Sequence, residues 1–155
     1  MDTSVTIIGI VFMVLIGIPL YFVMRGQSIN KKKIKTIMAG YKHYRFNISD
    51  KQNKKVLLLD SEKKAFLLID FNYKAERIFF INLNEVTSAE LDITTEGAGN
   101  TIATIAFAFQ NRNNQQKKLA PFYTSENNHM GQMYLDEDFR LTQKWQKLLS
   151  DCIAF

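Results

Sequence analysis

The sequence begins with an apolar stretch, residues 3–24, that contains no charged side chain. At about 1.5 Å per residue, a helix of this stretch is about 33 Å long, and the hydrocarbon core of a bilayer is about 30 Å thick. Gly9, Gly17 and Pro19 are compatible with such a helix, because glycine and proline are commoner in membrane helices than in soluble ones. The stretch therefore predicts a transmembrane anchor within residues 1–24.

Two other structures compete with an anchor: a cleaved secretory signal peptide and a helix buried in a soluble core. A signal peptide requires basic residues ahead of its apolar run and a small-residue cleavage site after it. Only Asp2 is charged ahead of the run, and no A-x-A pattern follows it. Unbroken apolar helices of this length are rare in soluble domains, so the anchor is the favoured interpretation.

The basic residues that follow the apolar stretch predict its orientation. Lys and Arg beside a membrane helix favour the cytoplasmic side. We therefore expect a single-pass protein with its amino terminus outside and its main domain, residues 41–155, in the cytoplasm. The residues expected to contact the membrane surface after the anchor are Arg25, Lys31, Lys32, Lys33 and Lys35.

The segment 25–40, between the anchor and the main domain, has two interpretations. Ile34, Ile37 and Met38 recur at helical spacing behind the lysines, which is compatible with a short interfacial helix. The favoured interpretation is a solvated basic juxtamembrane linker that follows the positive-inside rule and ends at Gly40.

The formal net charge of +5 is concentrated beside the apolar stretch. Residues 25–64 contain twelve Lys and Arg against three Asp and Glu, whereas residues 65–155 contain eight against eleven. An anionic leaflet attracts each basic residue near its surface by about 1 kcal/mol, so we expect contacts with anionic lipid. Nucleic-acid binding would also explain a pI near 9.3, but the basic residues are not interleaved with aromatic ones, and we expect no nucleic acid.

Beyond residue 40, short apolar runs alternate with polar turns, which is typical of strands. Tyr44, Phe46 and Ile48 alternate with polar residues, and 49–53 is expected to be the turn after them. Connections this short cannot hold the crossovers that parallel strands need, so the pattern predicts an antiparallel sandwich or barrel. The seven expected strands are 44–48, 56–59, 65–69, 77–81, 86–93, 102–109 and 119–123.

The end of the chain changes to a helical period, and we expect an α-helix over residues 136–152. Asp136, Glu137 and Asp138 are expected in its first turn, where negative charge complements the helix dipole. Trp145 is expected to be a core residue at an open end of the sheets. The apolar stripe of this helix consists of Leu141, Trp145, Leu148, Leu149 and Cys152.

Seven strands followed by one carboxy-terminal helix is the element order of the pleckstrin-homology-like (PH-like) superfold. The segments DSEKKAFLLID and RIFFINLNEVTSAEL resemble the mid-domain hairpin and following strand of bacterial PH-like proteins. The resemblance covers residues 41–153 and implies a mainly β (α+β) fold, a seven-stranded antiparallel barrel or sandwich capped by the helix. It also implies a non-catalytic binding or scaffolding module, here attached to a bacterial inner membrane.

Phosphoinositide-binding members of this family use basic residues in the first hairpin loop, and the resemblance places Lys51, Lys54 and Lys55 there. The family's K/R-x-R pattern in the following strand is replaced by Val-Leu-Leu at 56–58. The resemblance therefore implies that these lysines contact the membrane surface, without stereospecific recognition of a headgroup. A solvated basic loop is the other interpretation.

No pattern in the sequence predicts a catalytic, cofactor or metal site. The single cysteine, Cys152, and the two histidines, His43 and His129, are too dispersed for a zinc cluster. No glycine-rich phosphate loop or GxSxG nucleophile elbow is present. We therefore expect no enzyme activity, no cofactor and no metal.

Two functions remain compatible with the sequence. The preferred one is a single-pass membrane protein whose cytoplasmic PH-like domain binds a protein partner or the membrane surface. The alternative is a small membrane-associated enzyme whose site is assembled from dispersed residues. Within the segment 125–135, which is expected to be irregular, the candidate contacts for a protein partner are Met130, Met133 and Tyr134. Coverage of the sheet end is an equally favoured interpretation of these three residues.

Overall fold

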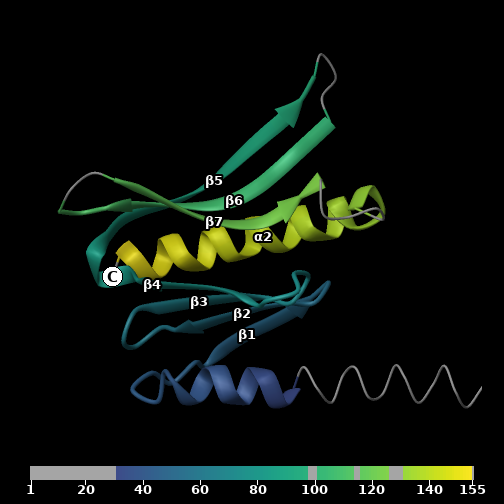
Figure 1. The fold of residues 1–155 in the computed structure, drawn as a ribbon. Helices are drawn as coiled ribbons and strands as arrows, with labels where there is room; N and C mark the ends of the chain where they lie inside the picture. Colours follow the sequence, from purple (N-terminus) through teal and green to yellow (C-terminus); the bar gives the residue numbers. More distant parts are fainter. Residues whose placement is uncertain (1–30, 98–100, 114–115, 126–130, 155) are drawn as a thin grey trace, which may run out of the picture. The chain divides into compact units, whose positions relative to one another are not determined.

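The computed structural model describes residues 31–97, 101–113, 116–125 and 131–154 (Figure 1). The chain divides into two compact units, Met1–His43 and Tyr44–Phe155, each of which is described by itself. The predicted anchor and the predicted membrane contact at Arg25 lie outside the described residues. Within the described ranges, no helix combines the length and hydropathy that crossing a bilayer requires.

In the first unit, residues 31–39 form an α-helix. The helix ends where the Gly40 N–H donates to the Ile37 carbonyl at 3.0 Å and the Tyr41 N–H donates to the Met38 carbonyl at 3.0 Å. This part of the predicted linker is therefore helical, as the alternative interpretation expected, and the position of the helix at a membrane interface stays a prediction. The exposed side chains of the helix include Lys31, Lys32, Lys33 and Lys35.

The second unit contains two antiparallel sheets and one long helix, which confirms the predicted mainly β architecture with a carboxy-terminal helix (Figure 1). The first sheet, in the order β1-β2-β3-β4, consists of β1 (Ile48–Gln52), β2 (Lys55–Asp60), β3 (Ala65–Asp70) and β4 (Arg77–Asn82). The second sheet, in the order β5-β6-β7, consists of β5 (Val86–Glu96), β6 (Thr101–Asn111) and β7 (Lys117–Thr124). The sheets are connected by the 3-10 turn η1 (Leu83–Glu85), and β7 is followed by the helix α2 (Gly131–Ala154).

The hydrophobic core lies between the two sheets, with α2 packed into it (Figure 1). Phe66 of β3 is at its centre: its ring centroid lies 5.6 Å from that of Phe107 in β6 and 5.9 Å from that of Trp145 in α2. Alternate residues of β6 face this core, because successive side chains of a strand point to opposite faces. Trp145 is 0% exposed, which confirms the prediction that it is a core residue.

The strands β2 and β3 are buried on both faces, since every one of their side chains is buried. Leu57 and Phe66 belong to the core between the sheets. Leu58 and Leu67 point to the opposite face, and they are only 4% and 0% exposed. Burial on both faces explains why these two strands are nearly continuous apolar runs without alternation.

The first strand differs from the prediction of a strand at 44–48 and a turn at 49–53. β1 begins at Ile48, where the predicted strand ends, and it pairs with β2 in a register from Ile48↔Leu59 to Gln52↔Lys55. The turn consists of Asn53 and Lys54 alone, whose φ angles of 47° and 61° fit a two-residue type I′ hairpin turn. The predicted strand and turn are therefore wrong, because pairing with β2 extends through the polar residues that were expected to form the turn.

The helix α2 begins at Gly131, so the acidic residues Asp136, Glu137 and Asp138 are not in its first turn. The helix-dipole explanation of these residues is therefore wrong. The helix starts earlier because Leu135 and Phe139 pack against the core and extend the apolar stripe toward the amino end. The predicted partner contacts Met133 and Tyr134 belong to α2 and not to an irregular segment, and Met130 lies outside the described residues.

Candidate protein-interaction site

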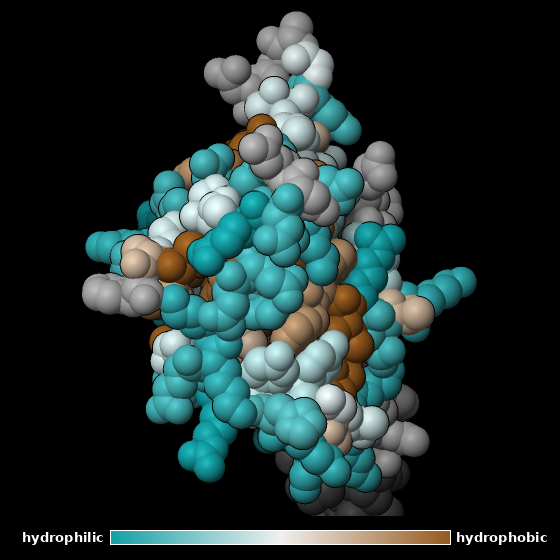
Figure 2. All heavy atoms as spheres, turned by 90° about the vertical axis from the view of Figure 1, so that its left-hand side faces the viewer, coloured by the Kyte–Doolittle hydropathy of each residue, from teal (hydrophilic) through white to brown (hydrophobic). Residues whose placement is uncertain are grey.

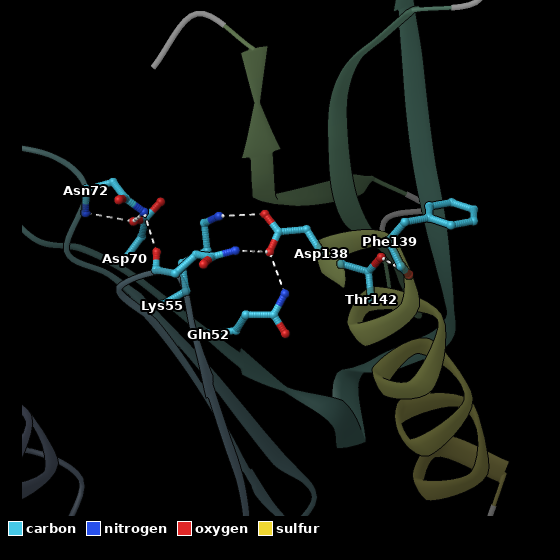
Figure 3. Close-up of polar contacts among 8 residues, drawn as sticks. Gln52, Lys55, Asp70, Asn72, Asp138, Phe139 and Thr142 are labelled. Carbon is cyan, nitrogen blue, oxygen red and sulfur yellow. Dashed lines mark hydrogen bonds and ion pairs between the residues drawn. The ribbon is translucent and has the colours of Figure 1, made fainter. Parts of the chain in front are cut away.

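A buried polar network joins the β1–β2 turn to α2 (Figure 3). Asp138 is 0% exposed, and its carboxylate accepts hydrogen bonds from Gln52 Nε2 at 2.7 Å and from Asn53 Nδ2 at 2.8 Å. Lys55 Nζ lies 3.3 Å from the second carboxylate oxygen and 4.6 Å from the centroid of the Phe122 ring. The charge of Lys55 is thus balanced by the carboxylate and by the negative face of the ring.

The cavity beside this network is small. Its volume is about 20 Å³, and its lining includes Lys55, Asp70 and Tyr73. A single water needs roughly 10–15 Å³ of this kind of volume, so the cavity has room for about one water. Asp70 in turn accepts hydrogen bonds from the backbone N–H and the side-chain amide of Asn72, at 2.9 and 2.8 Å (Figure 3). The network therefore fixes a turn against a helix and leaves no space for an organic substrate.

The three lysines predicted at the first hairpin loop have different environments. Lys51 and Lys54 are exposed. Lys55 is 4% exposed and its ammonium is bound to Asp138. Lys51 and Lys54 can therefore reach a surface outside the molecule, whereas Lys55 stabilises the interior.

The helix α2 also binds the edge strand of the first sheet. Asp50 of β1 accepts hydrogen bonds from Lys144 Nζ and from Trp145 Nε1, each at 2.8 Å. The hydrogen bond from Lys144 is the main cause that lowers the pKa of Asp50, and it outweighs the opposing effect of burial.

On the second sheet, α2 covers only the beginning of an edge strand. β5 is at the edge of this sheet, and its Ala89 carbonyl accepts hydrogen bonds from Gln146 Nε2 at 3.3 Å and from Ser150 Oγ at 3.2 Å. Backbone groups alternate in direction along a strand, so the peptide groups of Leu91 and Ile93 point to the same edge as that carbonyl. Within the described part of the chain, no hydrogen bond caps those peptide groups. β5 beyond Ala89 is therefore an open strand edge.

The open edge continues into a two-stranded arm (Figure 1). β6 pairs with β7 only as far as Thr104, opposite Thr124, whereas its pairing with β5 continues to Thr101, opposite Glu96. At the base of this arm, Ile93 is 41% exposed, although it lies on the same face of β5 as the core-packed Leu91. An exposed aliphatic side chain beside an unpaired strand edge is a surface that an additional strand could cover.

Two hollows flank the last turns of α2. Figure 2 views the side of the molecule that carries this end of α2, and it shows hydrophobic side chains in recesses between hydrophilic ones. A hollow of about 320 Å³ between β5 and α2 is bounded by residues that include Ala89, Glu90, Gln146 and Ile153. A hollow of about 260 Å³ on the side of β1 and β2 is bounded by residues that include Ile48, Leu59, Leu148 and Cys152.

The thiol of Cys152 faces the second of these hollows. Burial is the main cause that raises its pKa, and its sulfur lies 3.8 Å from the Ser61 carbonyl oxygen. A raised pKa lowers the fraction of reactive thiolate. Cys152 is therefore a packing residue at the rim of an apolar hollow. Among the described residues, no group of three His, Cys, Asp or Glu side chains is arranged to hold a metal ion.

Among the predicted partner contacts, Tyr134 does not adjoin either hollow. Tyr134 lies in the first turns of α2, about 28 Å along the helix axis from Ile153, at 1.5 Å per residue. The open edge of β5 was not among the predicted contacts. The alternation of Ala89, Leu91 and Ile93 with polar residues predicts a strand there, but alternation carries no information on whether that strand is at the edge of its sheet.

No family model, curated protein or solved structure matches this chain. The open edge of β5, with its hollow against α2, is consequently the feature from which a function can be inferred.

Proposed function

We propose that this protein is a non-catalytic binding module, tethered to a membrane, that holds a segment of a protein partner along the open edge of β5. The observation that carries the proposal is the pair of outward peptide groups at Leu91 and Ile93, to which no described residue is hydrogen-bonded. An extended segment that pairs with a strand edge gains main-chain hydrogen bonds, and its alternate side chains enter neighbouring pockets. The hollow between β5 and α2, beside Ala89, is placed to receive one of those side chains.

The PH-like assignment belongs to the same proposal. Two antiparallel sheets of four and three strands, followed by α2, agree with the element order of that superfold. Many unrelated functions occur on one fold, so the assignment supports a binding module only in general terms. The specific support comes from the edge of β5.

The tether is proposed from the apolar stretch, and its orientation from the basic residues that follow. Residues 3–24 are the proposed span, with the β domain on the cytoplasmic side of a bacterial inner membrane. Anionic lipid attracts exposed basic residues next to a span by about 1 kcal/mol each. The exposed residues that support such contacts are Lys31, Lys32, Lys33 and Lys35 of the first unit and Lys51 and Lys54 of the β domain.

Site-specific crosslinking of the full-length protein in its native membrane tests the proposal. A photoreactive amino acid in place of Ile93, which is 41% exposed, should give an adduct with a defined protein. Leu119 is a matched control, since it is 46% exposed and lies on β7, at the other edge of the same sheet. Equal adducts at both positions, or no adduct at position 93, would contradict the proposal.

A proline at the edge tests whether the contact uses main-chain hydrogen bonds. Leu91→Pro removes an N–H that points away from β6, so the pairing between β5 and β6 is retained, as it is for prolines on edge strands. We expect the adduct at position 93 to be lost in Leu91→Pro but retained in Leu91→Ala, which also removes the core-packed side chain and keeps the N–H. An adduct retained in Leu91→Pro would mean that side chains alone make the contact.

A further inference from the structure

We infer that the segment bound at β5 carries basic side chains at alternate positions, with aliphatic side chains between them. This inference rests on the proposed function and specifies the chemistry of the partner. The outer face of β5, opposite the core, is acidic. It carries Glu90, Asp92 and Glu96, since alternate side chains of a strand lie on the same face. The β-bulge beyond Thr94 has its extra residue in β6, so the side chains of β5 keep alternating as far as Glu96.

The acidic row can accept further cations. Glu90 and Glu96 are exposed, and neither forms an ion pair with another described residue. Asp92 already binds Lys117 Nζ of β7 at 2.9 Å, so an ammonium group is accommodated on this face. A strand added at the open edge would place its outward side chains beside these carboxylates. Opposite charges in such cross-strand pairs are stabilising, which favours Lys or Arg at those positions.

The inner side of the added strand would meet apolar groups. Leu91 and Ile93 lie on that face, and the Ile93 side chain is 41% exposed to solvent in the free protein. The hollow beside Ala89 continues this face toward α2. Aliphatic side chains at the positions between the basic ones would cover these groups and remove apolar surface from water.

The same charges argue against a second copy of this chain as the occupant. Antiparallel pairing of two β5 edges centred on Leu91 would set Glu90 of one copy opposite Asp92 of the other. Pairing centred on Ile93 would set Glu90 opposite Glu96. Like charges directly opposite one another are destabilising, so a basic segment of a protein partner fits this edge and the β5 strand of a second copy does not.

Two synthetic peptides of equal length test this chemistry: one alternates Lys with Val, and the other alternates Glu with Val. We expect the Lys-Val peptide to bind the full-length protein in a nonionic detergent about tenfold more tightly than the Glu-Val peptide, as measured by fluorescence anisotropy. The double variant Glu90→Lys and Glu96→Lys should invert this preference. Glu62→Lys is the matched control, because Glu62 is exposed in the turn after β2 and should leave the preference unchanged.

Equal affinities for the two peptides, no binding of either, or an unchanged preference in the double variant would overturn the inference. The crosslink from position 93 shows whether only the inference on basic side chains has failed or the proposed function as well. An adduct whose partner segment lacks basic residues contradicts the charge inference and leaves the binding edge in place. Absence of the adduct contradicts the binding edge itself.

Discussion

Asp138 is a carboxylate with no solvent exposure, and its charge is tolerated because both of its oxygens are hydrogen-bonded. Its partners Gln52 and Lys55 come from the first hairpin, so one helix residue fixes the position of that turn. Removing one member of a buried ion pair leaves the other charge buried without compensation, which costs about 3–5 kcal/mol. The stability of the β domain therefore depends strongly on this residue.

We expect Asp138→Ala to lower the free energy of unfolding by about 3–5 kcal/mol, measured by urea denaturation of the full-length protein in detergent. The double variant Lys55→Met and Asp138→Leu should recover most of this loss, because it replaces both charges with apolar side chains. Asp136→Ala is the control, since Asp136 is exposed. Equal effects of the two alanine variants would contradict the role of the network.

The burial of Asp138 was predictable from its spacing to the apolar residues of the helix, which the helix-dipole explanation did not consider. Asp138 precedes Leu141 by three residues, Trp145 by seven and Leu149 by eleven, so it lies on the apolar stripe of the helix. Asp136 lies off that stripe and is exposed. The identity of the partners was not predictable, because Gln52 and Lys55 meet Asp138 only through the tertiary packing of the first hairpin.

The ion pair of Asp50 predicts a pH dependence of stability. Lys144 holds the folded-state pKa of Asp50 below its ordinary value of 3.8, so the pair contributes stability above pH 3.8 and loses it as the pH falls through the folded-state pKa. Lys144 is 58% exposed, so solvent screens the pair. We expect Asp50→Asn to cost about 1 kcal/mol at pH 7 and progressively less below pH 3.8, measured by urea denaturation.

Asp92 provides the matched control for the size of the effect at pH 7. Its carboxylate is 30% exposed, as that of Asp50 is, and it binds a lysine at 2.9 Å, but no indole donates to it. Asp92→Asn should therefore have the smaller effect at pH 7. An effect as large as that of Asp50→Asn would mean that the indole hydrogen bond adds nothing to the stability.

At the scale of elements, the β1–β2 turn contains a conformational cost that substitution can relieve. Lys54 has a φ of 61°, which is unfavourable for a residue with a Cβ atom, and its side chain is exposed. We expect Lys54→Gly to raise the melting temperature by a few degrees, equivalent to about 0.5–1 kcal/mol, because Asn-Gly is the preferred pair in type I′ turns. Lys51→Gly, within β1, should instead destabilise the protein by about 0.5–1 kcal/mol.

The elements were predictable to the extent that their periodicity is local. The runs at 65–69 and 102–109 fall within β3 and β6, because alternating or continuous apolar residues are set by the burial of strand faces. The observed β1 lies later in the chain than the predicted strand, because its polar residues pair with β2. No local pattern in the sequence reveals that pairing. The order of strands within a sheet, and with it the open edge of β5, is a tertiary property.

At the scale of the whole molecule, the core cluster of the β domain includes none of the described residues of the first unit, 31–43. Every residue of the core cluster lies within Tyr44–Phe155. We therefore expect a chain that lacks residues 1–40 to fold alone and to unfold cooperatively, with a circular dichroism spectrum in which the strands outweigh α2. A predominantly helical spectrum would contradict both the domain boundary and the β architecture.

Because β2 and β3 are buried on both faces, we expect them to be the last part of the domain to unfold. Both strands are paired on each side and covered on each face, so their amide hydrogens should exchange with deuterium only when the whole domain unfolds. The arm of β5 is the opposite case, because no strand among the described residues lies along one of its sides. Exchange should therefore be slowest at the centre of the first sheet and fast in the arm. A ligand strand at β5 would then be detected as new protection confined to the arm, while the rates in β2 and β3 stay fixed by global unfolding.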